Sequence, residues 1–241
     1  IHPQFWEILD AAKARPIRHL MINTNGLRIA REAGFAERLA GYMPGFEVYL
    51  QFDSLKRDAL MELRGADLTR VRTEALEALE RNNISTTLVV TLKKGVNDDE
   101  ITDIVRFALD WRCVRGVTFQ PIQDAGRNDG FDAKRHRIVL TEVRRRIAEA
   151  GVFGLDDLIP LPCNPDQICI GYGLRNGREV RPVTAMLPRD LFVAAAPNTV
   201  TFESYPELRR QVFELLSLST AQGNTSEKLA SLLCCLPEAA V

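Results

Sequence analysis

The sequence predicts an α/β protein: a partial (β/α) TIM-like barrel of parallel strands, followed by an irregular α+β C-terminal extension. Two observations lead to this fold class. Up to Gly151, short apolar runs alternate with longer amphipathic runs, and each apolar run ends in a polar turn that leads into a helical pattern. Strands joined through helices need crossover connections, which make the sheet parallel. We therefore expect a barrel segment at residues 1–151 and an extension at residues 152–241.

Four short apolar runs predict the strands of this sheet. The run from Ser85 to Leu92 is rich in Thr and Val, whose β-branched side chains favour a pleated strand. The run that starts at Phe46 follows the turn residues Pro44-Gly45, which mark its beginning. The predicted strands cover residues 17–22, 46–52, 85–92 and 116–121.

Helices are predicted between these strands by apolar residues at helical spacing. The clearest stripe consists of Leu68, Val71, Ala75, Leu76 and Leu79, with charged residues between them. An acidic turn also favours the start of a helix near Asp99, because negative charge stabilises a helix N-terminus. The predicted helices are an opening one that includes residues 5–9, then 30–39, 68–82, 99–111 and 135–150.

The extension has a different character. Three prolines around Cys163 make Leu158–Pro165 too rigid for a regular element. Asn176-Gly177 lies in the middle of residues 172–182 and predicts a β-hairpin with a tight turn. Two further helices are expected at residues 205–218 and 226–235.

Composition excludes several classes of function. Lys and Arg total 31 against 32 Asp and Glu, so a net charge of −1 gives no electrostatic reason to expect nucleic-acid binding. No apolar run approaches the roughly 20 residues of a transmembrane helix. Five cysteines without disulfide-framework spacing fit a reducing compartment, and we expect a cytoplasmic protein. The chain lacks an initiator Met and ends on an apolar stretch, so we expect both termini to be truncations.

Other familiar sites find little support. The histidines His2, His19 and His136 are scattered, without the spacing of a zinc site. Neither a phosphate-binding Gly-rich loop nor a G-x-S-x-G nucleophile turn is present.

Polar residues follow the predicted strands at the points where a parallel barrel holds its ligands. They are mostly neutral hydrogen-bonding groups, which suit a zwitterionic, hydroxyl-bearing ligand. We expect Thr24, Gln51, Thr91 and Gln120 to line one cradle. The candidate binding residues are Thr24, Asn25, Gln51, Asp53, Thr91 and Gln120.

Structural roles compete with binding at these positions. Thr24-Asn25-Gly26 also suits a plain turn that needs a positive φ at Gly26. Asp53 would also cap a following helix, and Thr91 also suits a strand for its β propensity. Gln51 favours a site more strongly, because a buried amide without a hydrogen bond costs about 1–3 kcal/mol.

The ordered series of strand ends resembles the radical S-adenosylmethionine (SAM) superfamily. The residues that carry the resemblance are His2-Pro3, Thr24-Asn25-Gly26, Leu50-Gln51-Phe52-Asp53-Ser54 and the stretch Val89–Asn97. Tyr49–Asp53, Gly116–Pro121 and Pro160–Cys163 are similar to the branch that methylates pterin precursors and makes tetraether lipids. The resemblance covers residues 1–169 and, more loosely, the rest.

The resemblance implies SAM and a 4Fe-4S cluster as cofactors, and reductive cleavage of SAM to a 5′-deoxyadenosyl radical for methylation or C–C bond formation. Thr24 and Asn25 would lie near the methionine end of SAM, Gln51 and Thr91 near its ribose, and Gln120 near its adenine or the substrate. The implied partners are a small-molecule or lipid-like substrate and an electron donor such as ferredoxin or flavodoxin.

One departure from the family pattern concerns the cluster. Its CxxxCxxC segment does not occur in this sequence, so the ligands would lie outside this chain and the isolated chain would be inactive. Cys163 and Cys169 are candidate ligands of an auxiliary cluster, or free thiols of a structural loop. Two alternatives stay open: a non-catalytic barrel-like module that binds a nucleotide-like ligand or a protein partner, and an unrelated metabolic β/α barrel.

Overall fold

The computed structural model describes residues 2–17, 19–125, 130–161 and 163–195. The chain divides into two compact units, Ile1–Ile138 and a second one that begins at Val139. The domain boundary predicted after Gly151 stays a prediction, because compactness does not by itself show independent folding. None of the described helices is long and apolar enough to cross a membrane.

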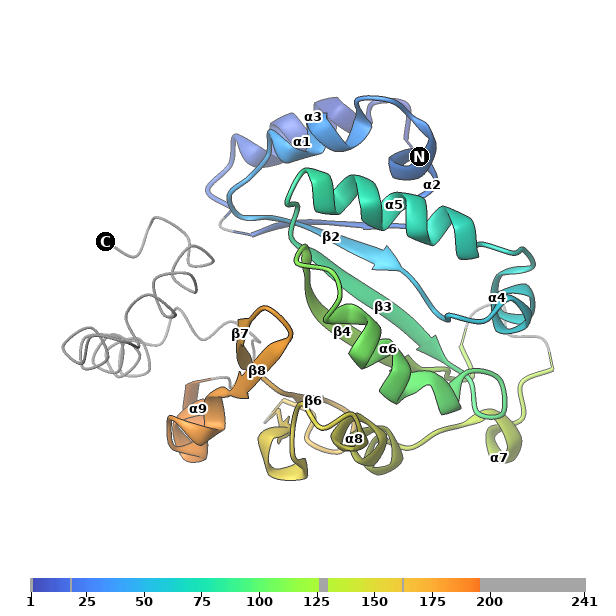
Figure 1. Cartoon of the computed structure of the whole chain (residues 1–241), viewed down its shortest axis with the longest axis vertical. Helices are drawn as coiled ribbons and strands as arrows, with labels where there is room; N and C mark the ends of the chain where they lie inside the picture. The colour runs from blue at the N-terminus through green and yellow to red at the C-terminus, as the bar shows by residue number, and fades with distance from the viewer. Residues whose placement is uncertain (1, 18, 126–129, 162, 196–241) are drawn as a thin grey trace. The chain divides into compact units, whose positions relative to one another are not determined.

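The first unit contains a four-stranded parallel sheet with the strand order β1-β2-β3-β4 (Figure 1). This sheet confirms the predicted mixed α/β fold class with parallel strands, as expected for part of a β/α barrel. Strand order follows chain order because each strand is joined to the next through helices. The strands are β1 (Leu20–Thr24), β2 (Phe46–Gln51), β3 (Thr86–Leu92) and β4 (Val114–Pro121).

The register of the strands assigns their side chains to two faces. Thr24 pairs with Leu50, and Leu50 pairs with Leu88, so these three share one face. Leu50 and Leu88 are fully buried there. Gln51 and Tyr49 belong to the opposite face, because successive side chains of a strand alternate.

Helices cover the apolar face of the sheet, and Figure 1 shows α5 along β2 and α6 along β4. Val71, Ala75, Leu76 and Leu79 of the predicted stripe are buried in α5, as an amphipathic helix on a sheet requires, whereas Leu68 is half-buried just before the helix begins. The helices are α1 (Phe5–Lys13), α2 (Leu27–Arg31), α3 (Phe35–Ala40), α4 (Arg57–Arg64), α5 (Thr69–Arg81), α6 (Ile101–Ala108) and α7 (Ala133–His136), with a 3-10 turn, η1 (Asp98–Glu100), before α6.

Two predicted helices are divided in the structure. The helix expected at 30–39 is interrupted at Gly34, whose φ of 77° lies in the left-handed region and separates α2 from α3. The helix expected at 135–150 ends at His136, because the carbonyl of His136 accepts a hydrogen bond from the Lys94 amide at 2.9 Å. The chain is extended at Val139 before the next helix begins.

The second unit contains short elements. The hairpin predicted at 172–182 is confirmed, with Gly177 at φ 62° in the turn. The expectation that Leu158–Pro165 has no regular element is wrong in part, since Ile159–Pro160 pairs with Cys169–Ile170. The elements are α8 (Leu140–Glu149), η2 (Leu155–Asp157), β5 (Ile159–Pro160), β6 (Cys169–Ile170), β7 (Gly173–Asn176), β8 (Glu179–Pro182), η3 (Val183–Ala185) and α9 (Arg189–Ala195). The helices predicted at 205–218 and 226–235 lie outside the described residues.

Candidate functional site

The side chains of Thr24 and Asn25 stabilise the turn that follows β1. Thr24 Oγ1 accepts a hydrogen bond from the Gly26 amide, and Asn25 Oδ1 accepts one from the Leu27 amide, both at 3.2 Å. Gly26 has a φ of 80°, and a Cβ there would lie 2.8 Å from Leu50 Cδ1. The turn therefore needs glycine at this position for both conformation and space.

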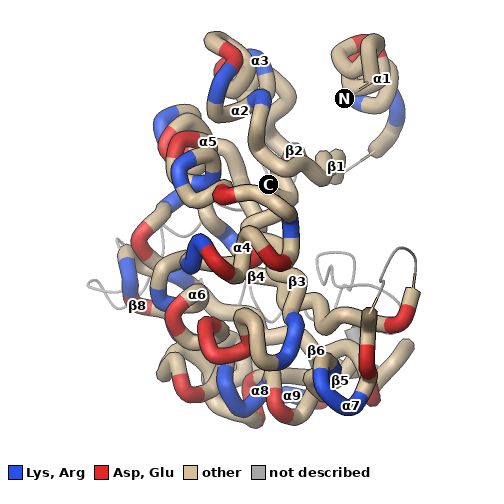
Figure 2. Tube along the Cα trace, turned by 90° about the vertical axis from the view of Figure 1, so that its right-hand side faces the viewer, with Lys and Arg blue, Asp and Glu red and all other residues tan. Residues whose placement is uncertain are grey.

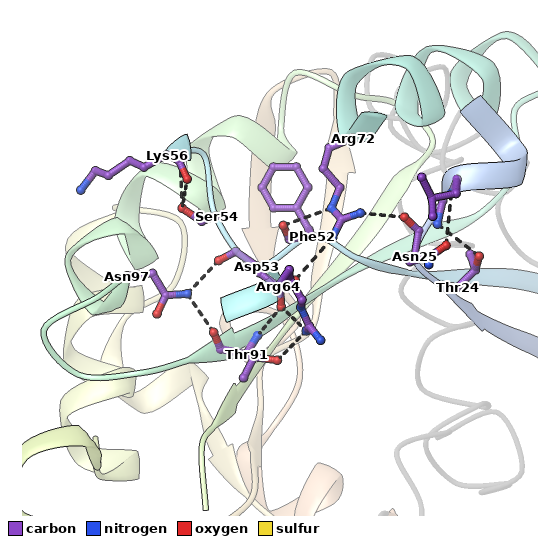
Figure 3. A network of polar contacts seen from close by, with 12 residues as sticks. Thr24, Asn25, Phe52, Asp53, Ser54, Lys56, Arg64, Arg72, Thr91 and Asn97 are labelled. Carbon is purple, nitrogen blue, oxygen red and sulfur yellow. Dashed lines mark hydrogen bonds and ion pairs between the residues drawn. The ribbon is translucent and has the colours of Figure 1, made fainter. Parts of the chain in front are cut away.

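Asp53, just beyond β2, is the centre of a buried polar network (Figure 3). Its carboxylate is fully buried and accepts two hydrogen bonds from Arg64, from Nε and Nη2, each at 2.7 Å. The amide of Thr91 donates a third at 3.2 Å. Asp53 thus neither caps a helix nor faces solvent, and it joins the end of β2 to β3 and α4.

Arg72 of α5 also belongs to this network and contacts it from the helix-covered side of the sheet. Only 2% of its side chain is exposed, and Nη1 donates to the carbonyl of Asn25 at 2.6 Å. Nε donates to the carbonyl of Phe52 at 3.4 Å, and Nη2 lies 3.5 Å from Asp53 Oδ2. Burial lowers the pKa of Arg72, and the nearby Asp53 carboxylate opposes that shift.

The sequence contained a signal for Arg72 that we did not use. Positions 68, 71, 72, 75, 76 and 79 follow one helical stripe, and residue 72 is its one charged member. A charged side chain on the buried stripe of a helix requires a partner in the interior. The predicted stripe of this helix contains only its apolar residues.

Two side chains from the segment after β3 fix the loop that follows β2. Asn97 Nδ2 donates to the carbonyls of Asp53 and Thr91, both at 2.8 Å. Glu100 accepts hydrogen bonds from the Leu55 amide at 2.9 Å and from the Ser54 hydroxyl. Burial raises the pKa of Glu100, while these two bonds lower it.

The face of the sheet opposite the helices is polar toward the carboxyl ends of its strands. The side chain of Gln51 is half-buried and that of Gln120 is exposed. No described residue forms a hydrogen bond with the side-chain amide of either residue. Thr91 is in register with Gln120 on this face, and Arg64 Nη2 donates to its hydroxyl at 3.1 Å. We call Gln51, Thr91 and Gln120 the polar face.

Thr24 does not lie on the polar face, and the expected cradle of Thr24, Gln51, Thr91 and Gln120 is corrected on this point. Thr24 is in register with Leu50 and therefore points to the helix-covered side. The exposed Asn23, in register with Tyr49, lies on the side of Gln51 instead. Asn23 was missed because the predicted strand ended at residue 22, whereas β1 continues to Thr24.

The remaining predicted residues, the cysteines, lie in the second unit. Cys163 is exposed, and Cys169 is half-buried in β6, where burial raises its pKa. In the part of the chain that the structure describes, no three His, Cys, Asp or Glu residues gather in a way that could hold a metal ion. A 4Fe-4S cluster takes cysteine ligands in sets of three or four, so the described residues do not fit one. Cys234 and Cys235 lie outside the described residues.

Charge on the described elements is mixed. Lys and Arg lie interspersed with Asp and Glu along the chain (Figure 2). Several of these charges form exposed pairs, such as Lys56 with Asp99 at 2.7 Å. Exposed pairs of this kind contribute little to stability, in contrast to the pair of Asp53 and Arg64, in which the carboxylate is fully buried.

Comparison with known proteins identifies relatives of the first part of the chain. Residues 1–108 match the family model of the Radical SAM superfamily. The chain is 29% identical over 162 residues to 7,8-dihydro-6-hydroxymethylpterin dimethyltransferase of Methanocaldococcus jannaschii, which covers 65% of this chain and 31% of that enzyme. It is 36% identical over 123 residues to GTP 3′,8-cyclase of Listeria monocytogenes, which covers 50% of this chain and 36% of that enzyme. The chain thus spans about a third of the length of these curated relatives.

Proposed function

Because residues 1–108 of this chain belong to the radical SAM superfamily, we propose that the polar face of the sheet binds SAM in an enzyme that cleaves this cofactor reductively. The observation that carries the proposal is the pair of amides, Gln51 and Gln120, which have no hydrogen-bonding partner among the described residues. An amide offers both donors and acceptors, which suit ribose hydroxyls and the edge of adenine.

The roles of the individual residues follow from their positions. Gln51 and Thr91 lie on the polar face beside the buried network, and we assign them to the ribose of SAM. We assign the more exposed Gln120 to the adenine or to the substrate. Thr24 and Asn25 shape the turn at the methionine end, and Asp53 acts from the interior by holding Arg64 and Thr91.

The cluster cysteines are not among these residues. The sequence has no CxxxCxxC segment, and under this proposal the ligands of the SAM-binding 4Fe-4S cluster lie outside the chain. The isolated chain is then inactive in SAM cleavage. Cys163 and Cys169 stay candidates for an auxiliary cluster that needs further ligands.

The finer reaction is proposed from the relatives. One is named a dimethyltransferase that acts on a pterin and the other a cyclase that acts on GTP. We accordingly propose methylation or C–C bond formation on a small-molecule or lipid-like substrate, with an electron donor such as ferredoxin or flavodoxin. A second candidate is a non-catalytic module that binds a nucleotide-like ligand or a protein partner, favoured by the missing CxxxCxxC segment.

The test uses the protein encoded by the complete natural reading frame. After anaerobic iron–sulfur reconstitution and addition of dithionite, mass spectrometry should detect 5′-deoxyadenosine. Gln51→Ala should raise the Kd for SAM about tenfold, since one lost hydrogen bond costs about 1–1.5 kcal/mol. Gln4→Ala, the same change at an exposed glutamine before α1, should leave the Kd unchanged.

Two results would count against the proposal. Absence of 5′-deoxyadenosine, with SAM bound by the iron-free protein, would favour the non-catalytic module. An unchanged Kd in both Gln51→Ala and Gln120→Ala would remove the polar face as the SAM site.

A further inference from the structure

We infer that Arg72 is a positioning residue for the proposed site, because its guanidinium fixes the turn after β1 against the end of β2. Nη1 binds the carbonyl of Asn25, and Nε binds the carbonyl of Phe52 (Figure 3). These two carbonyls belong to segments that are 27 positions apart in the chain. The inference rests on the proposed function only for the identity of the ligand, which is SAM.

The geometry of these contacts requires an arginine. A guanidinium presents its N–H groups in a rigid planar fork and can therefore address several acceptors at once. Arg72 donates hydrogen bonds to two carbonyls, and from the same position its Nη2 lies 3.5 Å from the Asp53 carboxylate, as an ion pair without a hydrogen bond. A lysine ammonium at the end of a flexible chain cannot hold all three acceptors in fixed directions.

Asp53 connects Arg72 with the third strand, β3, through further hydrogen bonds. The carboxylate that faces Arg72 Nη2 also accepts the Thr91 amide and two bonds from Arg64. Arg64 in turn donates to the Thr91 hydroxyl on the polar face. One buried side chain is therefore connected to the ends of β1, β2 and β3.

The turn after β1 is held by local hydrogen bonds, by close packing at Gly26 and by the hydrogen bond from Arg72. Its side-chain bonds from Thr24 and Asn25 are made within the turn itself. Gly26 packs closely over Leu50 and Ala75, where a Cβ would come within 3.2 Å of either side chain. Among the described residues, the side-chain hydrogen bond from Arg72 thus links the Asn25 carbonyl of this turn to the rest of the site.

The test compares Arg72→Met and Arg72→Lys in the complete reconstituted protein. Arg72→Met should raise the Kd for SAM at least tenfold, measured by calorimetry well below the melting temperature. Hydrogen–deuterium exchange should become at least tenfold faster at the amides of Gly26 and Leu27. Arg72→Lys should recover part of both losses and serves as the measured variant if Arg72→Met does not fold.

Two controls separate positioning from general destabilisation. Arg70→Met removes a neighbouring arginine on α5 that is 88% exposed and pairs with Glu74, and it should change neither readout. Leu79→Ala removes a fully buried side chain of the same helix. It should lower the melting temperature and leave the Kd for SAM within twofold of the wild type.

The outcomes distinguish this inference from the proposed function. An unchanged Kd in Arg72→Met and Arg72→Lys, or an equal rise of Kd in Leu79→Ala, overturns the positioning role. If the wild-type protein binds no SAM while Arg72→Met still accelerates exchange at the turn, the proposed function fails and the placement of the turn by Arg72 is supported.

Discussion

Replacement of Asp53 by asparagine is the most direct test of the buried network. Asparagine keeps the shape of the side chain and one acceptor oxygen, but it removes the negative charge. Its NH₂ group would also face one of the two N–H groups that Arg64 directs at the carboxylate. Two guanidinium groups, Arg64 and Arg72, would then lack their carboxylate.

The expected loss of stability follows from burial. Removal of one partner of a buried ion pair costs about 3–5 kcal/mol, because the other charge stays buried without compensation. Arg72 is only 2% exposed, but Arg64 keeps 30% of its side chain in contact with solvent, which screens part of its charge. We therefore expect Asp53→Asn to lower the free energy of unfolding by about 3 kcal/mol, near the lower end of that range.

Urea unfolding followed by circular dichroism measures this loss. The exposed pair of Lys56 and Asp99 provides the control, with side chains 52% and 65% exposed. Asp99→Asn should cost less than about 1 kcal/mol. The loss in Asp53→Asn should change little with added salt, because solvent ions screen buried charges poorly. A loss below about 1 kcal/mol for Asp53→Asn, or one that salt abolishes, would refute the reasoning.

Three further predictions concern single residues. Gly26→Ala should lower the free energy of unfolding by about 2 kcal/mol in the same urea assay, because φ is 80° and the new Cβ would meet Leu50; a neutral result would contradict the observed turn. Burial raises the pKa of Glu100 above its usual 4.5. Between pH 4.5 and the raised pKa, the native state therefore holds a proton that the unfolded chain has released. This group's contribution to the free energy of unfolding thus falls as pH rises from about 4.5 through the raised pKa. Glu100→Gln should flatten that slope in pH-dependent melting curves, and an unchanged slope would argue against the buried carboxyl. Burial raises the pKa of Cys113 to about 12. Iodoacetamide at neutral pH should therefore label the exposed Cys163 in the folded protein and leave Cys113 unlabelled, as measured by peptide mass spectrometry. Equal labelling of the two cysteines would contradict the burial of Cys113.

The sequence predicted the parallel sheet well because each strand is a local signal. The runs at 46–52 and 85–92 match β2 and β3 within a residue or two. The first strand was predicted about three residues too early, at 17–22 instead of Leu20–Thr24. Because strand side chains alternate, the exact register decided which side of the sheet Thr24 and Asn23 occupy.

The buried network could not be predicted from local patterns. Asp53 was a candidate ligand or helix cap, and its partners Arg64 and Thr91 lie 11 and 38 positions farther along the chain. The break of the helix expected at 135–150 likewise depends on a hydrogen bond from Lys94 to His136. Contacts between residues distant in sequence leave no periodic trace, so only the charge of Arg72 on its apolar stripe pointed to a buried partner.

Asn97 holds the backbone at this edge of the sheet from a buried position. Its single amide joins two backbone carbonyls, and its Oδ1 accepts the Lys93 amide at 2.9 Å. Backbone geometry at the rim is therefore maintained from the interior, by a residue that is fully buried. The side chains of Gln51 and Gln120 take no part in this bracing, so their replacement should leave the architecture beneath them intact.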